Sequence, residues 1–185
     1  TCAQGTARLT VGDQPLLHMT GRVYYDGNAS PQPLHRLGFA RWWWARLAFP
    51  DHELLLYHLH PNDPAAPPRH IAVRVTPDGA CAELSDAQIT PVRTRANVWG
   101  ARAPHVLNVT GTDTDVQVTV HQTWETGPFY QRFRVIAQTP HAQAYGVAEV
   151  VHPERIHRPW RRPLIEMRVH RLNAPSSKWL PLFGG

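Results

Sequence analysis

Two runs of the chain decide its fold class: Val116-Gln117-Val118-Thr119-Val120-His121 and Phe129-Tyr130-Gln131-Arg132-Phe133-Arg134-Val135-Ile136-Ala137. In the first run each valine is followed by a polar residue, which is the period of two that places one face of a β-strand in a core. In the second run Phe129, Gln131, Phe133, Val135 and Ala137 share one face. Because only a few residues, Thr126-Gly127-Pro128 among them, separate the two runs, the pair predicts an antiparallel hairpin.

The same period recurs along the chain. Further strands are predicted at residues 7–11, 16–25, 39–49, 53–60, 71–75, 80–83, 105–110, 144–151 and 163–172. Turn residues are frequent between them, with 18 prolines and 12 glycines, and Pro61 to Pro68 reads as one long surface loop. Short strands at this spacing are typical of an all-β sandwich or barrel. We expect an antiparallel, lipocalin-like (calycin-type) β-barrel of about eight to ten strands, formed by residues 1–185 as a single domain, with one short helical turn near Pro153 to Trp160.

Composition narrows the function classes. Charged residues are 18% and hydrophobic residues 42% of the 185 residues, which is a globular balance. No run approaches the ~20 apolar residues of a membrane-spanning helix, and Thr1 does not open a secretory leader. The net charge is +5, but the arginines are scattered except for Arg155, Arg158, Arg161 and Arg162, so no nucleic-acid partner is predicted. Cys2 and Cys81 lack any metal-binding spacing. These features favour a cytoplasmic protein.

Two groups of side chains can carry chemistry. Tyr24 and Asp26 lie two residues apart and share a face of a predicted strand end, where they can form an acid pair; alternatively, Asp26 accepts backbone N–H groups in an Asp-Gly turn. Trp42 and Trp44 share a face and Trp43 takes the other, so the tryptophans either line an apolar pocket and stabilise positive charge or fill the core.

His58 and His60 are also spaced to share a strand face. Such a pair can bind a metal when a third ligand comes from a neighbouring strand, but the sequence offers no identifiable third ligand, so no metal site is predicted. The chain also lacks a glycine-rich phosphate loop, a nucleophile elbow and the His-Glu-x-x-His pattern.

Several motifs arrive in a recognisable order. They are Gly21-Arg22-x-Tyr24-x-Asp26-x-Asn28, Trp42-x-Trp44-x-Arg46, Phe129-Tyr130-x-Arg132-Phe133, Pro163-Leu164-Ile165-x-Met167-Arg168-Val169 and Trp179-Leu180-Pro181-Leu182-Phe183. In this order the chain resembles the carotenoid 1,2-hydratase (hydroxyneurosporene synthase) family. That resemblance implies two consecutive lipocalin-like barrels, of which this chain is similar to the second, and a first barrel in the same precursor or in a partner chain.

The resemblance also implies a reaction, the addition of water to a terminal C=C bond of a hydrophobic polyene. Asp26 would be the general acid and Tyr24 would position it, because a carboxylic acid in an apolar pocket keeps its proton near neutral pH. Trp42 or Trp44 would shield the resulting cation, and Tyr130 and Arg132 would contribute to substrate binding. No metal, nucleotide or redox cofactor is implied.

The same residues also fit three other functions. They are a pericyclase or cyclase of the same superfamily, a non-catalytic carrier of a hydrophobic ligand, and a structural subunit that closes a partner's site. Trp160, which lies within the arginine cluster, suggests peripheral membrane contact; alternatively it plugs one end of the barrel from a solvated loop.

Overall fold

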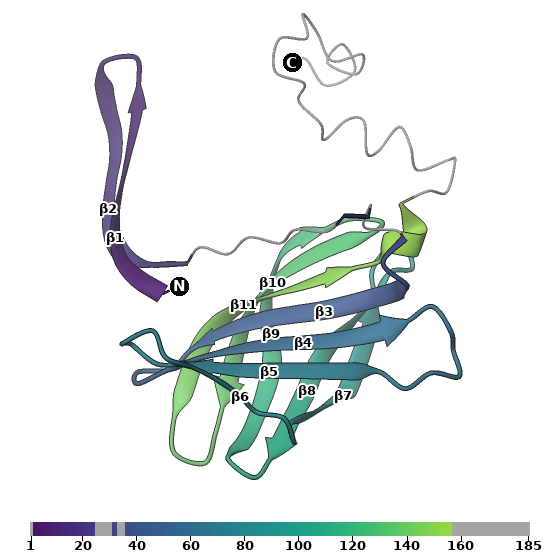
Figure 1. Cartoon of the computed structure of the whole chain (residues 1–185). Helices are drawn as coiled ribbons and strands as arrows, with labels where there is room; N and C mark the ends of the chain where they lie inside the picture. Colours follow the sequence, from purple (N-terminus) through teal and green to yellow (C-terminus); the bar gives the residue numbers. More distant parts are fainter. Residues whose placement is uncertain (1, 25–30, 33–35, 157–185) are drawn as a thin grey trace, which may run out of the picture.

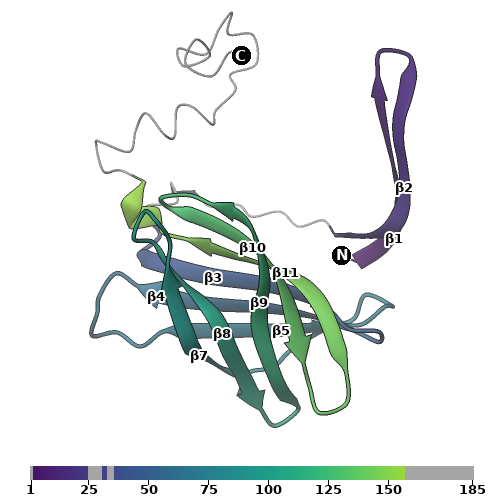
Figure 2. The same cartoon turned by 180° about the vertical axis from the view of Figure 1, so that it is seen from behind.

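The computed structural model describes residues 2–24, 31–32 and 36–156, and these are almost entirely β-structure. A two-stranded hairpin and a nine-stranded antiparallel sheet account for the strands. The hairpin is β1 (Cys2–Val11) and β2 (Gln14–Tyr24), and Figures 1 and 2 show it standing apart from the larger sheet. The larger sheet contains β3 (Phe39–Ala48), β4 (Glu53–Pro61), β5 (Arg69–Val75), β6 (Cys81–Glu83), β7 (Gln88–Ala96), β8 (Arg102–Gly111), β9 (Thr114–Thr126), β10 (Tyr130–Gln138) and β11 (Gln143–Val151), and the 3₁₀ turn η2 (Pro153–Arg155) follows it.

The nine-stranded sheet consists of two meanders joined along one edge. Its order is β6-β5-β4-β3-β11-β10-β9-β8-β7, so every neighbouring pair is consecutive in the chain except β3 and β11. The sheet curls on itself, so that β3, β4 and β5 face β7, β8 and β9 across the interior (Figures 1 and 2). The arrangement is that of an up-and-down barrel opened between β6 and β7.

Side-chain hydrogen bonds cross the seam between β6 and β7. Nδ1 of His70 on β5 lies 3.2 Å from the Ile89 amide and 3.1 Å from Oε1 of Gln88, both on β7. Further along, Nη2 of Arg74 donates to the Asp113 carbonyl at 2.7 Å. The seam therefore brings the β5 edge of one meander against the β7 edge of the other.

The core fills the inside of the curl. On β3 the side chains of Trp43, Ala45 and Leu47 are buried, whereas Trp42 and Trp44 lie on the outer face and are half-buried. The same alternation runs through the other long strands. The buried core also includes Phe49, Leu54, Leu56, Ala72, Ala87, Ile89, Ala103, Leu107, Val109, Val116, Val118, Phe133, Val135, Ala137, Ala144, Ala148 and Val150.

Gly146 allows β11 to approach β3 closely. A Cβ atom at this position would lie 2.2 Å from the Arg46 carbonyl oxygen, which is far inside van der Waals contact with backbone that cannot move aside. Since the β3–β11 ladder is the one that joins the two meanders, this glycine is required where the sheet is assembled from its two halves.

The expected all-β, lipocalin-like fold is confirmed, as is the β9–β10 hairpin. The helical turn is confirmed as a 3₁₀ turn over Pro153–Arg155. β7 was not predicted, because Pro91 interrupts it and most of its side chains are exposed, which leaves no clear alternation. The strand expected at 163–172 lies outside the described residues. The expectation of one domain over 1–185 stays a prediction, since β1 and β2 form a sheet of their own.

Candidate functional site

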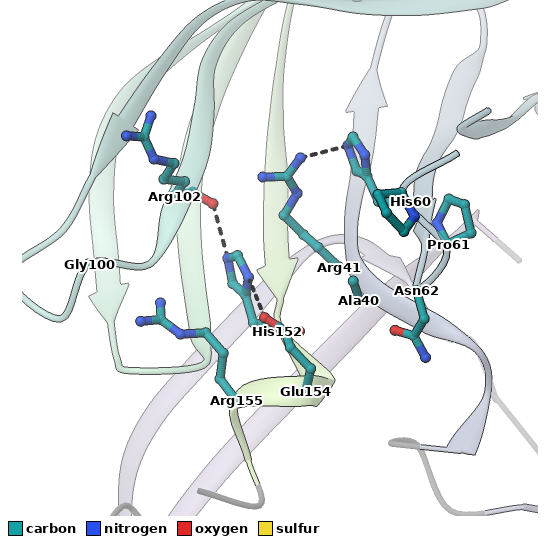
Figure 3. Close-up of a pocket in the computed structure, with 11 residues that line it drawn as sticks. Ala40, Arg41, His60, Pro61, Asn62, Gly100, Arg102, His152, Glu154 and Arg155 are labelled. Carbon is teal, nitrogen blue, oxygen red and sulfur yellow. Dashed lines mark hydrogen bonds and ion pairs between the residues drawn. The ribbon is translucent and has the colours of Figure 1, made fainter. Parts of the chain in front are cut away.

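A pocket of about 480 Å³ opens at one end of the curled sheet (Figure 3). It lies between the β3–β4 ends on one side and the β8 start with η2 on the other. Its lining residues are Ala40, Arg41, His60, Pro61, Asn62, Pro64, Gly100, Arg102, His152, Glu154 and Arg155.

The β3–β4 ladder positions the first wall of the pocket. Arg41 and His60 are register partners on adjacent strands, and Nη2 of Arg41 lies 2.9 Å from Nε2 of His60. Because a guanidinium can only donate, His60 accepts this bond at Nε2 and carries its proton on Nδ1. Burial, followed by the charge of Arg41, lowers the pKa of His60 to about 4, so the imidazole is neutral at physiological pH.

The opposite wall is held by the turn after β11 and by the loop between β7 and β8. Nε2 of His152 lies 3.0 Å from the Arg102 carbonyl, and Nδ1 of His152 lies 3.6 Å from a carboxylate oxygen of Glu154. Nη2 of Arg155 donates to the Trp99 carbonyl at 2.8 Å. Asn97 ties the loop down, since its Oδ1 accepts from two loop amides and its Nδ2 donates to the Gly127 carbonyl.

The pocket mouth is cationic. Arg41, Arg102 and Arg155 line it, against the single carboxylate of Glu154 among the lining residues. Burial lowers the pKa of Arg41; the Glu154 charge opposes this effect, and the nearby Arg102 adds to it. Such an arrangement attracts negative or electron-rich groups to the mouth.

A polar row lies one layer further inside. Trp43, His58 and His70 are register neighbours on β3, β4 and β5 and turn their side chains inward, two residues along the strands from Arg41 and His60. The His58 ring stacks on the His70 ring at 4.9 Å and meets the His60 ring edge-on at 4.4 Å. Burial first, and then the neighbouring His60, His70 and Arg41 charges, lower the pKa of His58 to about 3. His58 is therefore neutral near pH 7 and, like Trp43, enclosed, whereas His70 at the seam is half-buried.

These histidines contact one another as rings. Within the described ranges, no three His, Cys, Asp or Glu side chains converge as metal ligands. The His58–His60 pair that the sequence singled out is thus part of a stacked aromatic cluster, whose third member, His70, comes from β5.

The six residues that the sequence proposed for the site fall in three places. Tyr24 ends β2, where it pairs with Cys2, and Asp26 lies outside the described residues. Trp42, Trp44, Tyr130 and Arg132 come together on the outer face of β3, β11 and β10, because the register aligns Trp42 with Val151 and Tyr130, and Trp44 with Glu149 and Arg132.

The outer-face residues form a polar contact of their own. The Arg132 guanidinium donates to Oε1 of Glu149 from both Nε, at 2.9 Å, and Nη2, at 2.7 Å. The hydrogen bond to Glu149 raises the pKa of Arg132, while burial and then Glu149 raise that of Tyr130. A role for these four residues in substrate binding stays a prediction.

Several pocket residues were not singled out from the sequence. The period of two places Arg41 and Trp43 on one face of their strand and His58 and His60 on one face of theirs, so the sequence could have shown that the members of each pair lie together. His70, Arg102 and His152 carried none, because only the register and the closing turn bring them to the site.

Together, the curled antiparallel sheet and the pocket at one of its ends define a lipocalin-like protein. The model of the family Carotenoid hydratase CrtC matches residues 4–178, and the chain belongs to that family. It is 25% identical over 152 residues to an acyclic carotenoid 1,2-hydratase of Rhodobacter capsulatus, covering 82% of this chain and 51% of that protein.

A solved structure shares the fold. The chain is similar to kievitone hydratase from Nectria haematococca with a TM-score of 0.51 and 15% identity, covering 80% of this chain and 49% of that one. The chain therefore spans about half the length of both relatives. Among the described residues, no helix has the length and apolar character needed to cross a bilayer.

Proposed function

We propose that this chain is the hydratase-type half of an enzyme that adds water to a C=C bond of a hydrophobic polyene or isoprenoid. The observation that carries the proposal is the match of residues 4–178 to a family of carotenoid hydratases. The likeness to an acyclic carotenoid 1,2-hydratase supports the substrate class.

The chemistry requires a strong acid, because an isolated alkene is a poor base. Asp26 is the proposed acid and Tyr24 its positioning residue. Proton transfer from the carboxyl to the terminal alkene carbon leaves a tertiary carbocation, which an indole face can stabilise by about 0.5–2 kcal/mol. Because Trp42 and Trp44 lie on the outer face of β3, Trp43 is the indole of this strand that can do so for a cation inside the barrel. Water then adds to the cation, and its surplus proton restores the acid.

Product analysis with an acyclic carotenoid, lycopene, tests the proposal. The chain is assayed alone and co-expressed with a first lipocalin-like barrel, in ordinary water and in H₂¹⁸O. We expect a product heavier by one water that carries the heavy oxygen, and no product from Asp26→Asn. Asp115→Asn, at an exposed residue of β9, is the matched control and should retain activity.

Other results of this product analysis would identify a different function for the chain. A product of unchanged mass but altered structure would identify a cyclase, and bound lycopene recovered unchanged would identify a carrier. An Asp26→Asn variant with full turnover would remove Asp26 from the mechanism. Turnover by the partner barrel alone would reduce this chain to a structural subunit.

The proposed enzyme comprises two barrels. Coverage of about half of both relatives supports a first barrel in the same precursor or in a partner chain. We therefore expect activity of the isolated chain to be weak or absent and to rise when the first barrel is supplied.

Peripheral membrane contact is part of the same proposal, because the substrates dissolve in lipid. Besides Trp160, which lies outside the described residues, the loop beside the pocket presents Val98, 91% exposed, and Trp99, 38% exposed, next to Arg155. Aromatic and basic side chains together suit a membrane interface. Flotation with anionic liposomes should weaken in Trp99→Ala and Trp160→Ala, but not in Trp124→Ala, at an exposed tryptophan of β9.

A further inference from the structure

Four buried nitrogen atoms in the inner row lack a protein partner. They are Nε1 of Trp43, both ring nitrogens of His58, and Nε2 of His70. Trp43 is 1% and His58 2% exposed, so bulk solvent does not satisfy them. Leaving a buried donor or acceptor unpaired costs about 1–3 kcal/mol each. Four such atoms gathered in one row thus indicate a binding site for a polar group.

The row presents both donors and acceptors. Nδ1 of His70 contacts two groups of β7, the Ile89 amide, which donates, and Oε1 of Gln88, which accepts, and these two contacts favour opposite tautomers of the ring. Nε2 of His70 is a donor in one tautomer and an acceptor in the other. Nε1 of Trp43 is always a donor, and the neutral His58 ring supplies one donor and one acceptor. The row thus offers two or three N–H donors and one or two lone pairs.

A water molecule matches this set. It accepts from the indole of Trp43, donates to the free lone pair of His58, and accepts from or donates to Nε2 of His70 according to the tautomer of that ring. An anion would leave the His58 lone pair unsatisfied, and a cation would meet the indole and imidazole N–H groups. A buried water typically makes about three hydrogen bonds, the number available here.

We propose that Trp43, His58 and His70 hold an ordered water inside the barrel, and that this water is the nucleophile of the hydration reaction. The second half rests on the proposed function. When the alkene carbon has taken its proton from the acid, a lone pair of the water oxygen forms the new C–O bond to the cation. His58 accepts one O–H proton through its free ring nitrogen, and that proton returns to the acid to complete the cycle.

A weak base is sufficient for this step. Burial makes His58 a poor base, but the oxonium ion formed when water attacks a cation is far more acidic than any imidazolium, so transfer remains downhill. A low pKa has a further consequence, since His58 stays unprotonated near neutral pH and keeps its lone pair available to the water.

The pocket supplies the route to the row. His60 lines the pocket, and its ring contacts that of His58 at 4.4 Å. The row lies two residues further along the strands, about 7 Å deeper than the mouth. Water entering by the pocket therefore reaches His58 after passing one layer of side chains.

Nuclear magnetic resonance tests the water itself on the unmodified chain. In a ¹⁵N-labelled sample, the assigned indole N–H of Trp43 should show a dipolar cross-peak to water with the sign of a long-lived, protein-bound molecule in paired NOESY and ROESY spectra. The indole of Trp124, which is 52% exposed, is the control and should show only fast surface water. A Trp43 indole without a bound-water cross-peak would overturn the proposal.

Variant kinetics, in the two-barrel preparation, test the role of that water. Removing the base in His58→Phe should lower kcat on lycopene about a hundredfold while KM changes by no more than about twofold, because the polyene is not bound by this nitrogen. His58→Gln, which keeps an acceptor, should recover part of the loss and covers the case in which the phenylalanine variant misfolds. His121→Phe, at an exposed residue of β9, should leave kcat unchanged.

The outcomes separate the two proposals. An active enzyme whose kcat is insensitive to both His58 substitutions would show that the bound water is not the nucleophile. A preparation without hydration of lycopene would refute the proposed function and the role of the water in it. The cross-peak at Trp43 would still decide whether the row binds water.

Discussion

The buried histidines should make the protein lose stability on mild acidification. His58 has a folded-state pKa of about 3 and His60 one of about 4, whereas an unfolded chain titrates its histidines near 6.5. Above about pH 6.5 both histidines are neutral in the folded and in the unfolded chain, so they do not make the free energy of unfolding depend on pH. Below about pH 6.5 the unfolded chain binds protons that the folded chain does not bind. The free energy of unfolding therefore decreases as the pH is lowered, until the pH reaches the folded-state pKa.

The size of the effect follows from proton linkage. A difference of one bound proton changes the free energy of unfolding by roughly 1 kcal/mol per pH unit. For His58, which is 2% exposed, the loss between about pH 6.5 and pH 4 is on the order of 3 kcal/mol. His60, at the pocket wall, adds a smaller loss in the same direction. Asp78 and Asp86 have pKa values lowered by their hydrogen bonds to Thr76 and Thr112, so they act below this window.

Urea denaturation at several pH values between 7.5 and 4.5 measures the slope directly. His58→Phe should reduce the slope by about 1 kcal/mol per pH unit, and His141→Gln, at an exposed turn residue, should leave it unchanged. The same slope in His58→Phe and in the unmodified chain would show that His58 is not held neutral in the folded state, and the reasoning from burial would fail.

Four further substitutions, in two matched pairs, test a close backbone approach and a buried ion pair. Gly146→Ala should destabilise the sheet by about 1–3 kcal/mol in urea denaturation, because the new Cβ would lie 2.2 Å from the Arg46 carbonyl oxygen. The control is Gly21→Ala, at an open position of β2, which should change stability by less than about 0.5 kcal/mol. Equal losses of stability in the two variants would refute the argument from close approach. Glu53→Gln should cost about 3 kcal/mol, because Glu53 is 3% exposed and its carboxylate takes two bonds from Arg46. Glu149→Gln, which breaks the more exposed pair with Arg132, should cost less than about 1 kcal/mol, and a larger loss there than at Glu53 would contradict the ranking by burial.

The sequence by itself determined the strands whose alternation is clear and the hairpin between β9 and β10, because a period of two is a local property of neighbouring residues. It also placed His58 and His60 on one face for the same reason. The order of the motifs gave the family resemblance, which the match over residues 4–178 confirms.

Only the tertiary structure decided which face of β3 is inside. The alternation separates Trp43 from Trp42 and Trp44 but does not assign either face to the core; curling of the sheet turns Trp43 inward and leaves the other two outside. Strand register likewise places His70 beside His58, and the seam brings Nδ1 of His70 to Gln88 and Ile89, 18 and 19 residues away in the chain. Register and closure are long-range properties, so the site they assemble does not exist in any single stretch of the sequence.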